Sequence, residues 1–256
     1  MAGTSLSSRW IRRFHPAPQA ATRLVYLPHA GGSATSCFQT SRALAPDVDV
    51  LAVQYPGRQD RINEPCITEI STLADRIVDE LNPWLDRPVT LFGHSMGSTV
   101  AYEVALRLER RGVVPLGLFA SGRRAPSVHR DPRVRLGSDE DLLADLKLLS
   151  GTDDQVFADE ALVRMILPPL RGDYHAIETY RPEPGSSLTC PVIALSGDDD
   201  PVVELDEVAL WERHTSASFR MRVFSGGHFF IDGHLPAITQ EIRDHIAAAS
   251  GPRTDA

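Results

Sequence analysis

Short apolar segments alternate with longer segments of helical periodicity along most of this chain. The apolar segments lie at 23–29, 48–57, 88–95, 115–122, 191–200 and 219–228. Most of them are continuously apolar, which is typical of strands covered by helices on both faces. Helical periodicity lies between them, near 69–85, 96–112, 204–214 and 234–249. The alternation predicts a mostly parallel α/β sheet with right-handed crossovers.

One region interrupts this alternation, because no segment between Gly122 and Pro191 has the pattern of a strand. "SDEDLLADLKLLSG" begins with a capping box at Ser138 and Asp141 and continues with leucines on one helical face, namely Leu142, Leu143, Leu146 and Leu149. "DEALVRMILPPLRGDYHAIETY" follows, with apolar positions at Leu162, Met165, Ile166 and Leu170. Its Pro168-Pro169 pair predicts a break or kink. We expect one domain over 1–256 with a helical lid insertion at about 123–188; the alternative is a helical pair that covers the sheet edge.

The apolar segments share a second property, which concerns where they end. Each ends in glycine, serine, histidine or aspartate. In an open α/β sheet, sites form at the carboxyl ends of the strands. Small and polar residues at these ends therefore indicate a functional site at that edge.

Composition and charge narrow the class of protein. The chain has 256 residues and a net charge of −8, so we expect no nucleic-acid or membrane partner. Its three cysteines, Cys37, Cys66 and Cys190, are widely spaced, which favours buried thiols in a reducing compartment over disulfides or a zinc site. The N-terminal segment lacks the apolar stretch of a signal peptide. We expect a cytoplasmic monomer that needs no cofactor.

The stretch "LFGHSMGSTVAYEVA" places Ser95 where an apolar segment passes into a helical pattern. Gly93 and Gly97 relieve crowding in a sharp strand-to-helix turn, which lets a serine adopt strained geometry and expose its hydroxyl. A helix that begins at Met96 offers unpaired N–H groups to an oxyanion. The pattern favours a nucleophilic serine; the alternative is an ordinary strand-to-helix connection.

A serine hydroxyl needs a base to act as a nucleophile, and the chain holds nine histidines. His228, in "VFSGGHFF", follows the last apolar segment, which predicts a base at the same sheet edge as Ser95. We expect His94 to pack and His29 to shape the loop after it. Hydrogen-bonded or solvated roles are expected for the histidines in helical patterns, which are His175, His214 and His245.

An orienting acid for the base is expected in "SGDDDP", which follows the segment "VIAL". Among its three aspartates we choose Asp200, because it lies farthest along the turn and directly precedes Pro201. Asp198 and Asp199 are expected to cap or solvate the loop. A metal site is the competing interpretation, but no second group of spaced ligands accompanies these acids. The chain order serine, acid, histidine is that of α/β hydrolases.

A second oxyanion donor is expected from the glycine-rich loop "PHAGGSA". Ala30 is the preferred donor and Gly31 the alternative. A phosphate-binding loop would need a GxGxxG pattern or a Walker lysine, and neither is present.

Together these motifs resemble those of a known family. "LPHAGGSA", "VQYPGRQDR", "LFGHSMGSTVAYEVA", "LPPLRGDYHAIETYR", "ALSGDDDPVV" and "FSGGHFF" cover nearly the whole chain. They are similar to the type II thioesterases of polyketide and nonribosomal peptide biosynthesis, which are stand-alone α/β hydrolases. The first two motifs are far more specific than a GxSxG match alone.

The resemblance implies an editing enzyme that hydrolyses aberrant or stalled acyl groups from the phosphopantetheine arm of acyl or peptidyl carrier protein domains. It implies that Ser95 is the nucleophile, His228 the base and Asp200 its orienter. Met96 and Ala30 would supply the oxyanion N–H groups. A separate hypothesis is that arginines at the start of the insertion steer an acidic carrier protein; the alternative is a solvated loop with scattered arginines. These residues are Arg123, Arg124, Arg130, Arg133 and Arg135.

Three other functions remain open at this stage. A carboxylesterase acting on free esters would use the same triad, so thioester preference rests on the resemblance alone. A macrocyclising release enzyme would also use it, but is usually fused to a synthase. A non-catalytic hydrolase-fold binding protein is the third alternative; such proteins commonly lack one member of the triad, whereas this chain has a candidate for all three.

Overall fold

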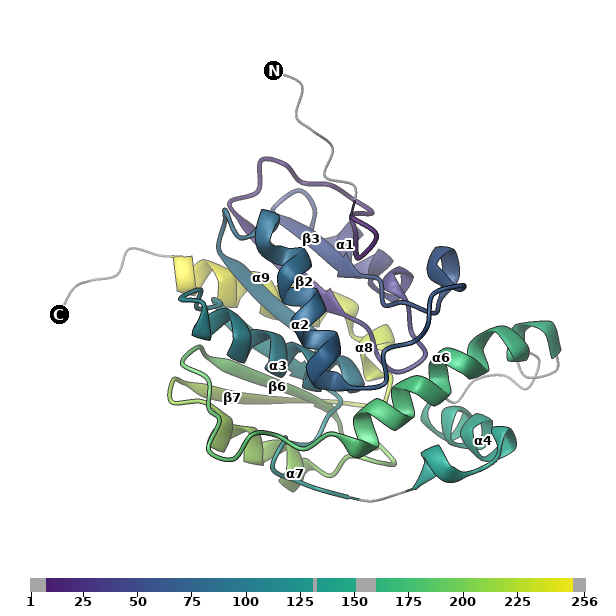
Figure 1. The fold of residues 1–256 in the computed structure, drawn as a ribbon. Helices are drawn as coiled ribbons and strands as arrows, with labels where there is room; N and C mark the ends of the chain where they lie inside the picture. The colour runs from purple at the N-terminus through teal and green to yellow at the C-terminus, as the bar shows by residue number, and fades with distance from the viewer. Residues whose placement is uncertain (1–7, 131–132, 151–159, 251–256) are drawn as a thin grey trace.

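The computed structural model describes residues 8–130, 133–150 and 160–250. In this part of the chain a seven-stranded sheet forms the centre of the protein, and Figure 1 shows its place in the fold. The strands are β1 (Ile11–Arg12), β2 (Thr22–Leu27), β3 (Val48–Val53), β4 (Val89–His94), β5 (Gly117–Ser121), β6 (Val192–Gly197) and β7 (Phe219–Phe224). Their order is β1-β3-β2-β4-β5-β6-β7. Only β1 pairs antiparallel, so the predicted mostly parallel sheet is confirmed.

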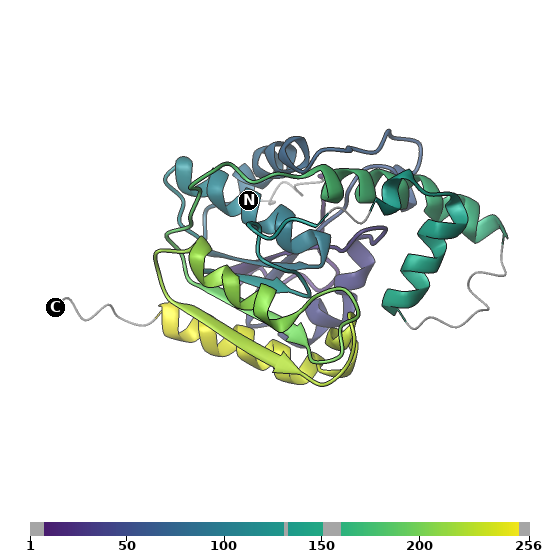
Figure 2. The ribbon, with the colours of Figure 1, turned by 90° about the horizontal axis from the view of Figure 1, so that it is seen from below.

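Helices cover both faces of this sheet, as Figure 2 shows from below. The described α-helices are α1 (Phe38–Leu44), α2 (Ile70–Leu81), α3 (Met96–Arg110), α4 (Asp139–Ser150), α6 (Glu160–Thr179), α7 (Leu205–Ala209), α8 (Phe230–Gly233) and α9 (Leu235–Ser250). Short 3₁₀ turns occupy Ala34–Cys37, Gln59–Arg61, Asn82–Trp84, Val134–Leu136 and Leu210–His214.

Two apolar cores lie on opposite faces of the sheet. One packs α2, α3 and Trp211 against one face, and the other packs α1 and α9 against the opposite face. Strands β2 to β6 are therefore buried along their whole length. This double burial explains why their sequences are apolar without alternation.

All six predicted strands and all four predicted core helices are present. The sequence analysis missed β1, because two residues are too few to show a period, and α1, because "FQTSRAL" carries few apolar positions. In the described part of the chain, no helix has the length and apolar run needed to cross a bilayer.

The predicted insertion holds α4 and α6, which lie beyond the carboxyl ends of the strands (Figure 1). The expected capping box begins α4: the Ser138 N–H donates to Asp141 Oδ2 at 2.8 Å, and the Asp141 N–H donates to Ser138 Oγ at 3.2 Å. Leu142 is fully buried against Leu170 and Tyr174 of α6. This contact joins the two helices.

Of the predicted break or kink at Pro168-Pro169, the break is wrong, because α6 continues from Glu160 to Thr179 with both prolines inside it. Each interior proline removes one backbone hydrogen bond, at a cost of about 3 kcal/mol. The residues after the prolines, Leu170, Asp173 and Tyr174, are all at least 90% buried. We attribute the continuity of the helix to this packing. Met165, expected on the apolar face, is instead 47% exposed, and the side chain of Leu162 lies outside the described residues.

Candidate active site

Ser95 lies on a sharp turn between β4 and α3, with φ 54° and ψ −120°. This left-handed geometry costs a non-glycine residue about 1–3 kcal/mol, so the surroundings must enforce it. A Cβ on Gly97 would lie 2.1 Å from the carbonyl oxygen of Leu27, and one on Gly93 would lie 2.1 Å from that of Gly97. The two glycines are therefore needed for close backbone packing. The Ser95 N–H also donates to the Ser121 carbonyl at 2.8 Å, which fixes the turn against β5.

Three of the predicted site residues meet at this turn. His228 Nε2 lies 2.9 Å from Ser95 Oγ, and His228 Nδ1 lies 2.7 Å from Asp200 Oδ2. A carboxylate only accepts, so the Nδ1–H donates to Asp200 and leaves Nε2 to accept the serine proton. His228 is 2% exposed and the Asp200 side chain is fully buried. A nucleophile–base–acid chain of this kind can activate a serine.

Asp200 is fixed by the backbone that follows it. Its Oδ1 accepts the N–H groups of Val202 at 3.0 Å and Val203 at 3.2 Å, which leaves Oδ2 to face His228. Asp198 instead accepts the Gly226 N–H at 2.9 Å and so joins the loops after β6 and β7. This is the capping role expected for it.

The other histidines take structural positions. His94 is fully buried and hydrogen-bonds Ser121 Oγ through Nδ1 at 3.0 Å. Burial lowers its pKa well below the usual value, and His228 and His29 lower it further. Burial together with His228 and Arg58 lowers the pKa of His29 to about 4. Both shifts favour the neutral imidazole, which adds no positive charge beside His228.

His214 and His245 are hydrogen-bonded, as expected. The ring of His214 contacts the Tyr102 hydroxyl at 3.3 Å and Ser127 Oγ at 2.9 Å. His245 Nε2 lies 2.9 Å from the Leu116 carbonyl. His175 is exposed. None of the three contacts Ser95 or Asp200 in the described part of the chain.

Two backbone N–H groups are available beside Ser95. Met96 is the first residue of α3, so its N–H has no acceptor within the helix. The Ala30 N–H likewise has no acceptor among the described residues, whereas the Gly31 N–H donates to Asp173 Oδ2 at 2.7 Å. This contact distinguishes the two donors that the sequence left open, because only Ala30 keeps a free N–H.

A cavity of about 200 Å³ opens over Ser95, Ala30 and Met96. Leu146 and Leu149 of α4 and Ile177 of α6 contribute to its apolar wall. Pockets with mostly apolar walls and a few polar groups are typical small-molecule sites.

Arg123 and Arg124 also line this cavity and are half-buried, so they do not form the exposed docking surface that the sequence suggested. The reason is topological: β5 ends at Ser121, and the next residues cross beside Ser95. Burial and the neighbouring Arg124 lower the pKa of Arg123 to about 9, and no carboxylate pairs with either arginine in the described residues. Arg130 is neutralised by Glu204 and Glu207.

Comparison with known proteins identifies the family of this chain. A family model described as "Thioesterase domain" matches residues 22–246. The chain belongs to the thioesterase family. It is 51% identical to the thioesterase PikA5 of Streptomyces venezuelae, over 96% of this chain and 88% of that protein.

Solved structures identify the class of thioesterase to which the chain belongs. The type II thioesterase BorB from the borrelidin biosynthetic cluster superposes with a TM-score of 0.89 at 50% identity, covering 94% of this chain and 99% of that one. YbtT, the type II thioesterase from the yersiniabactin pathway, superposes with a TM-score of 0.84 at 30% identity over 94% and 100% of the chains. The thioesterase described here is a serine hydrolase of this type II class, with the α/β-hydrolase fold.

Sequence reasoning missed one pair of residues at the site of this thioesterase. Arg58 and Asp173 are 5% and 2% exposed and form an ion pair beside Ala30 and Gly31. Both lie in motifs that carried the family resemblance, "YPGRQDR" and "LRGDY". The charged residue in each motif was a signal that the sequence offered. That Arg58 and Asp173 pair with each other could not be predicted, because they lie far apart in the chain and only the tertiary fold brings them together.

Proposed function

We propose that this type II thioesterase removes aberrant or stalled acyl groups from the phosphopantetheine arm of carrier protein domains, using Ser95, His228 and Asp200. The observation that carries the proposal is the unbroken hydrogen-bond chain from Ser95 Oγ to Asp200 at the floor of a cavity. BorB and YbtT are named as type II thioesterases of biosynthetic pathways, which supports a carrier-bound thioester as the substrate.

Acylation begins when Ser95 Oγ attacks the thioester carbonyl carbon and its proton passes to His228 Nε2. The tetrahedral intermediate carries an oxyanion, which accepts hydrogen bonds from the N–H groups of Ala30 and Met96. One such donor is worth about 2.7–4 kcal/mol of barrier. The carbon–sulfur bond then breaks, and the pantetheine thiol leaves with the proton from His228. Asp200 stabilises the imidazolium formed between these steps.

Deacylation repeats the sequence with water as the nucleophile. His228 takes a proton from the water as its oxygen attacks the acyl carbonyl, and the same two N–H groups hold the second oxyanion. Collapse returns the proton to Ser95 Oγ and releases the free acid. Because water and not an internal nucleophile completes the reaction, the product is linear.

Helices α4 and α6 act as a lid in this proposal. They supply the apolar wall of the cavity, and they are joined through Leu142 and through the Tyr174 hydroxyl, which donates to Asp145. A wall of this kind keeps bulk water from the acyl group while leaving a polar floor at Ser95. The lid thereby sets the space available to the acyl chain.

Arg123 and Arg124 provide the positive charge that attracts the phosphate of the arm. Two unpaired guanidinium groups in a cavity favour an anionic ligand, because buried charges are usually paired. An Arg123→Gln variant should raise KM for propionyl-phosphopantetheine but not for propionyl-N-acetylcysteamine, which has no phosphate. An equal change in both KM values would argue against a phosphate contact.

Deacylation of a propionyl carrier protein, followed by mass spectrometry, tests the whole proposal. Wild-type protein should release propionate, cleave a nitrophenyl ester more slowly, and lose both activities in Ser95→Ala. Cleavage of the free ester alone would favour a carboxylesterase. No reaction with either substrate would favour a binding protein.

A further inference from the structure

Arg58 and Asp173 are buried, charged and absent from the steps above, although both contact the loop that carries Ala30. Asp173 lies on α6, and Arg58 follows β3 in the turn before Gln59–Arg61. A single oxygen, Asp173 Oδ2, accepts both from the Arg58 guanidinium and from the Gly31 N–H, the latter at 2.7 Å. One carboxylate on the lid helix therefore binds two separate loops beside Ser95.

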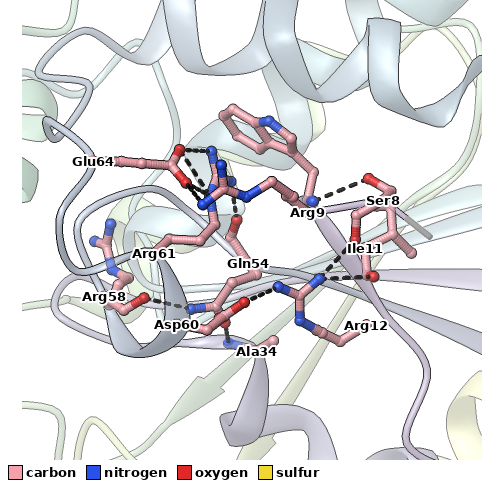
Figure 3. Close-up of polar contacts among 11 residues, drawn as sticks. Ser8, Arg9, Ile11, Arg12, Ala34, Gln54, Arg58, Asp60, Arg61 and Glu64 are labelled. Carbon is pink, nitrogen blue, oxygen red and sulfur yellow. Dashed lines mark hydrogen bonds and ion pairs between the residues drawn. The ribbon is translucent and has the colours of Figure 1, made fainter.

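Arg58 itself is held in place by three contacts. Its guanidinium donates to the Pro56 carbonyl at 2.7 Å and lies over the Tyr55 ring, 5.1 Å from the centroid. Its carbonyl accepts from Gln54 Nε2 at 3.1 Å (Figure 3). A side chain fixed in this way presents its charge to Asp173 at one position. Arg58 is thus a rigid partner and not a mobile surface arginine.

The loop at 28–34 is in turn held on both sides of the candidate oxyanion donor. After the donor, the Gly31 N–H donates to Asp173. The Ala34 N–H donates to Gln54 Oε1 at 2.8 Å (Figure 3). Gly31 has φ 72°, and a Cβ there would lie 3.1 Å from Leu170 Cδ1 of α6. Before the donor, the Pro28 carbonyl accepts from the Tyr55 hydroxyl at 3.2 Å.

We propose that Asp173 is a positioning residue, which locks this loop through the Gly31 N–H and so presents the Ala30 N–H to the oxyanion. Helix α6 is then part of the oxyanion hole as well as part of the lid. The inference rests on the proposed roles of Ser95 and Ala30. It also implies that α6 stays in place during turnover, because lifting it would break the Arg58–Asp173 ion pair and remove the acceptor of the Gly31 N–H.

Two uncharged replacements of similar size separate positioning from charge. The amide oxygen of Asp173→Asn can still accept from Gly31 and Arg58, whereas Asp173→Leu can accept from neither. We expect kcat to fall about 100-fold in Asp173→Leu, as for loss of one oxyanion donor, and less than about 10-fold in Asp173→Asn. KM should change by less than about 2-fold, because the ground-state thioester makes little use of the hole.

A matched control exists at the opposite edge of the sheet. Asp49 is also buried, accepts the Ala17 N–H at 3.1 Å and pairs with Arg13 and Arg23, but it lies at the amino end of β3, away from Ser95. Asp49→Leu should lower the melting temperature much as Asp173→Leu does, yet keep kcat within about 2-fold of wild type. A purely structural role for Asp173 would make the two variants equivalent.

The double variant Arg58→Met/Asp173→Leu keeps the test valid if the single variant does not fold. Replacing a buried ion pair by apolar side chains is often neutral for stability, yet the Gly31 N–H still lacks its acceptor. The affinity for an acyl trifluoromethyl ketone is the second readout. Ser95 Oγ adds to its carbonyl carbon, the proton passes to His228, and the carbonyl oxygen becomes an oxyanion.

The outcomes are distinct. We expect the double variant to bind this ketone about 100-fold more weakly, in parallel with its kcat. A folded double variant with wild-type kcat and wild-type ketone affinity would overturn the positioning role while leaving Ser95→Ala inactive. Thioesterase activity in Ser95→Ala would instead overturn the proposed function itself.

Discussion

Replacing Asp200 by asparagine tests the electrostatics of the site without changing its shape. In the native protein Oδ1 faces two donors, the N–H groups of Val202 and Val203, and Oδ2 faces His228 Nδ1 at 2.7 Å. An asparagine amide must place its oxygen against those two N–H groups. Its NH₂ group then points at His228 Nδ1, which has to accept.

The consequence is a wrong tautomer. With Nδ1 accepting, the ring proton moves to Nε2, which lies 2.9 Å from Ser95 Oγ and can no longer take the serine proton. A triad in this state loses about 10⁴-fold in kcat, which corresponds to about 5 kcal/mol of barrier. The fold should be unaffected, because every backbone hydrogen bond to the side chain is kept.

Single-turnover acylation by propionyl-N-acetylcysteamine measures this loss directly, with thermal unfolding as the check on folding. Asp198→Asn is the matched control, since among the described residues that neighbour accepts only the Gly226 N–H. Its acylation rate should stay within about 3-fold of wild type, because it makes no contact with the base. A folded Asp200→Asn protein that loses less than about 100-fold would show that the tautomer argument is wrong.

Three further predictions concern stability and the lid. The pKa of His29 is lowered to about 4 in the folded protein, so the unfolded chain binds the proton at higher pH, and up to about 3 kcal/mol of stability should be lost as pH falls from 6.5 to 4. His29→Leu should flatten this part of the pH profile of stability in urea titrations, and an unchanged profile would contradict the prediction. Gly97→Ala, whose Cβ would meet the Leu27 carbonyl, should lower the free energy of unfolding by at least about 2 kcal/mol, and an unaltered melting temperature would refute that packing. Tyr174→Phe removes the hydrogen bond to Asp145 and should raise amide exchange in α4 about 10-fold, with exchange in α9 unchanged as the control.

The strands and main helices could be predicted because their signals are local. Strands β2 to β6 are each buried on both faces, so most of their sequences are continuously apolar and can be recognised without knowledge of the fold. The unbroken α6 could not be predicted, because Pro168 and Pro169 are unfavourable locally. We attribute the continuity of the helix to the burial of Leu170, Asp173 and Tyr174, which requires the rest of the fold.

The sequence by itself determined the chemistry and the edge at which it gathers. Ser95, Asp200 and His228 each follow a strand, and parallel strands bring their carboxyl ends to one side of a sheet whatever the details of packing. What the tertiary structure alone decided are contacts between segments far apart in the chain. Asp173 takes the Gly31 N–H and leaves that of Ala30 free, and Arg123 turns into the cavity and not toward a docking surface. Such choices depend on distances of a few ångströms between elements, and these distances are set by packing and not by residue pattern.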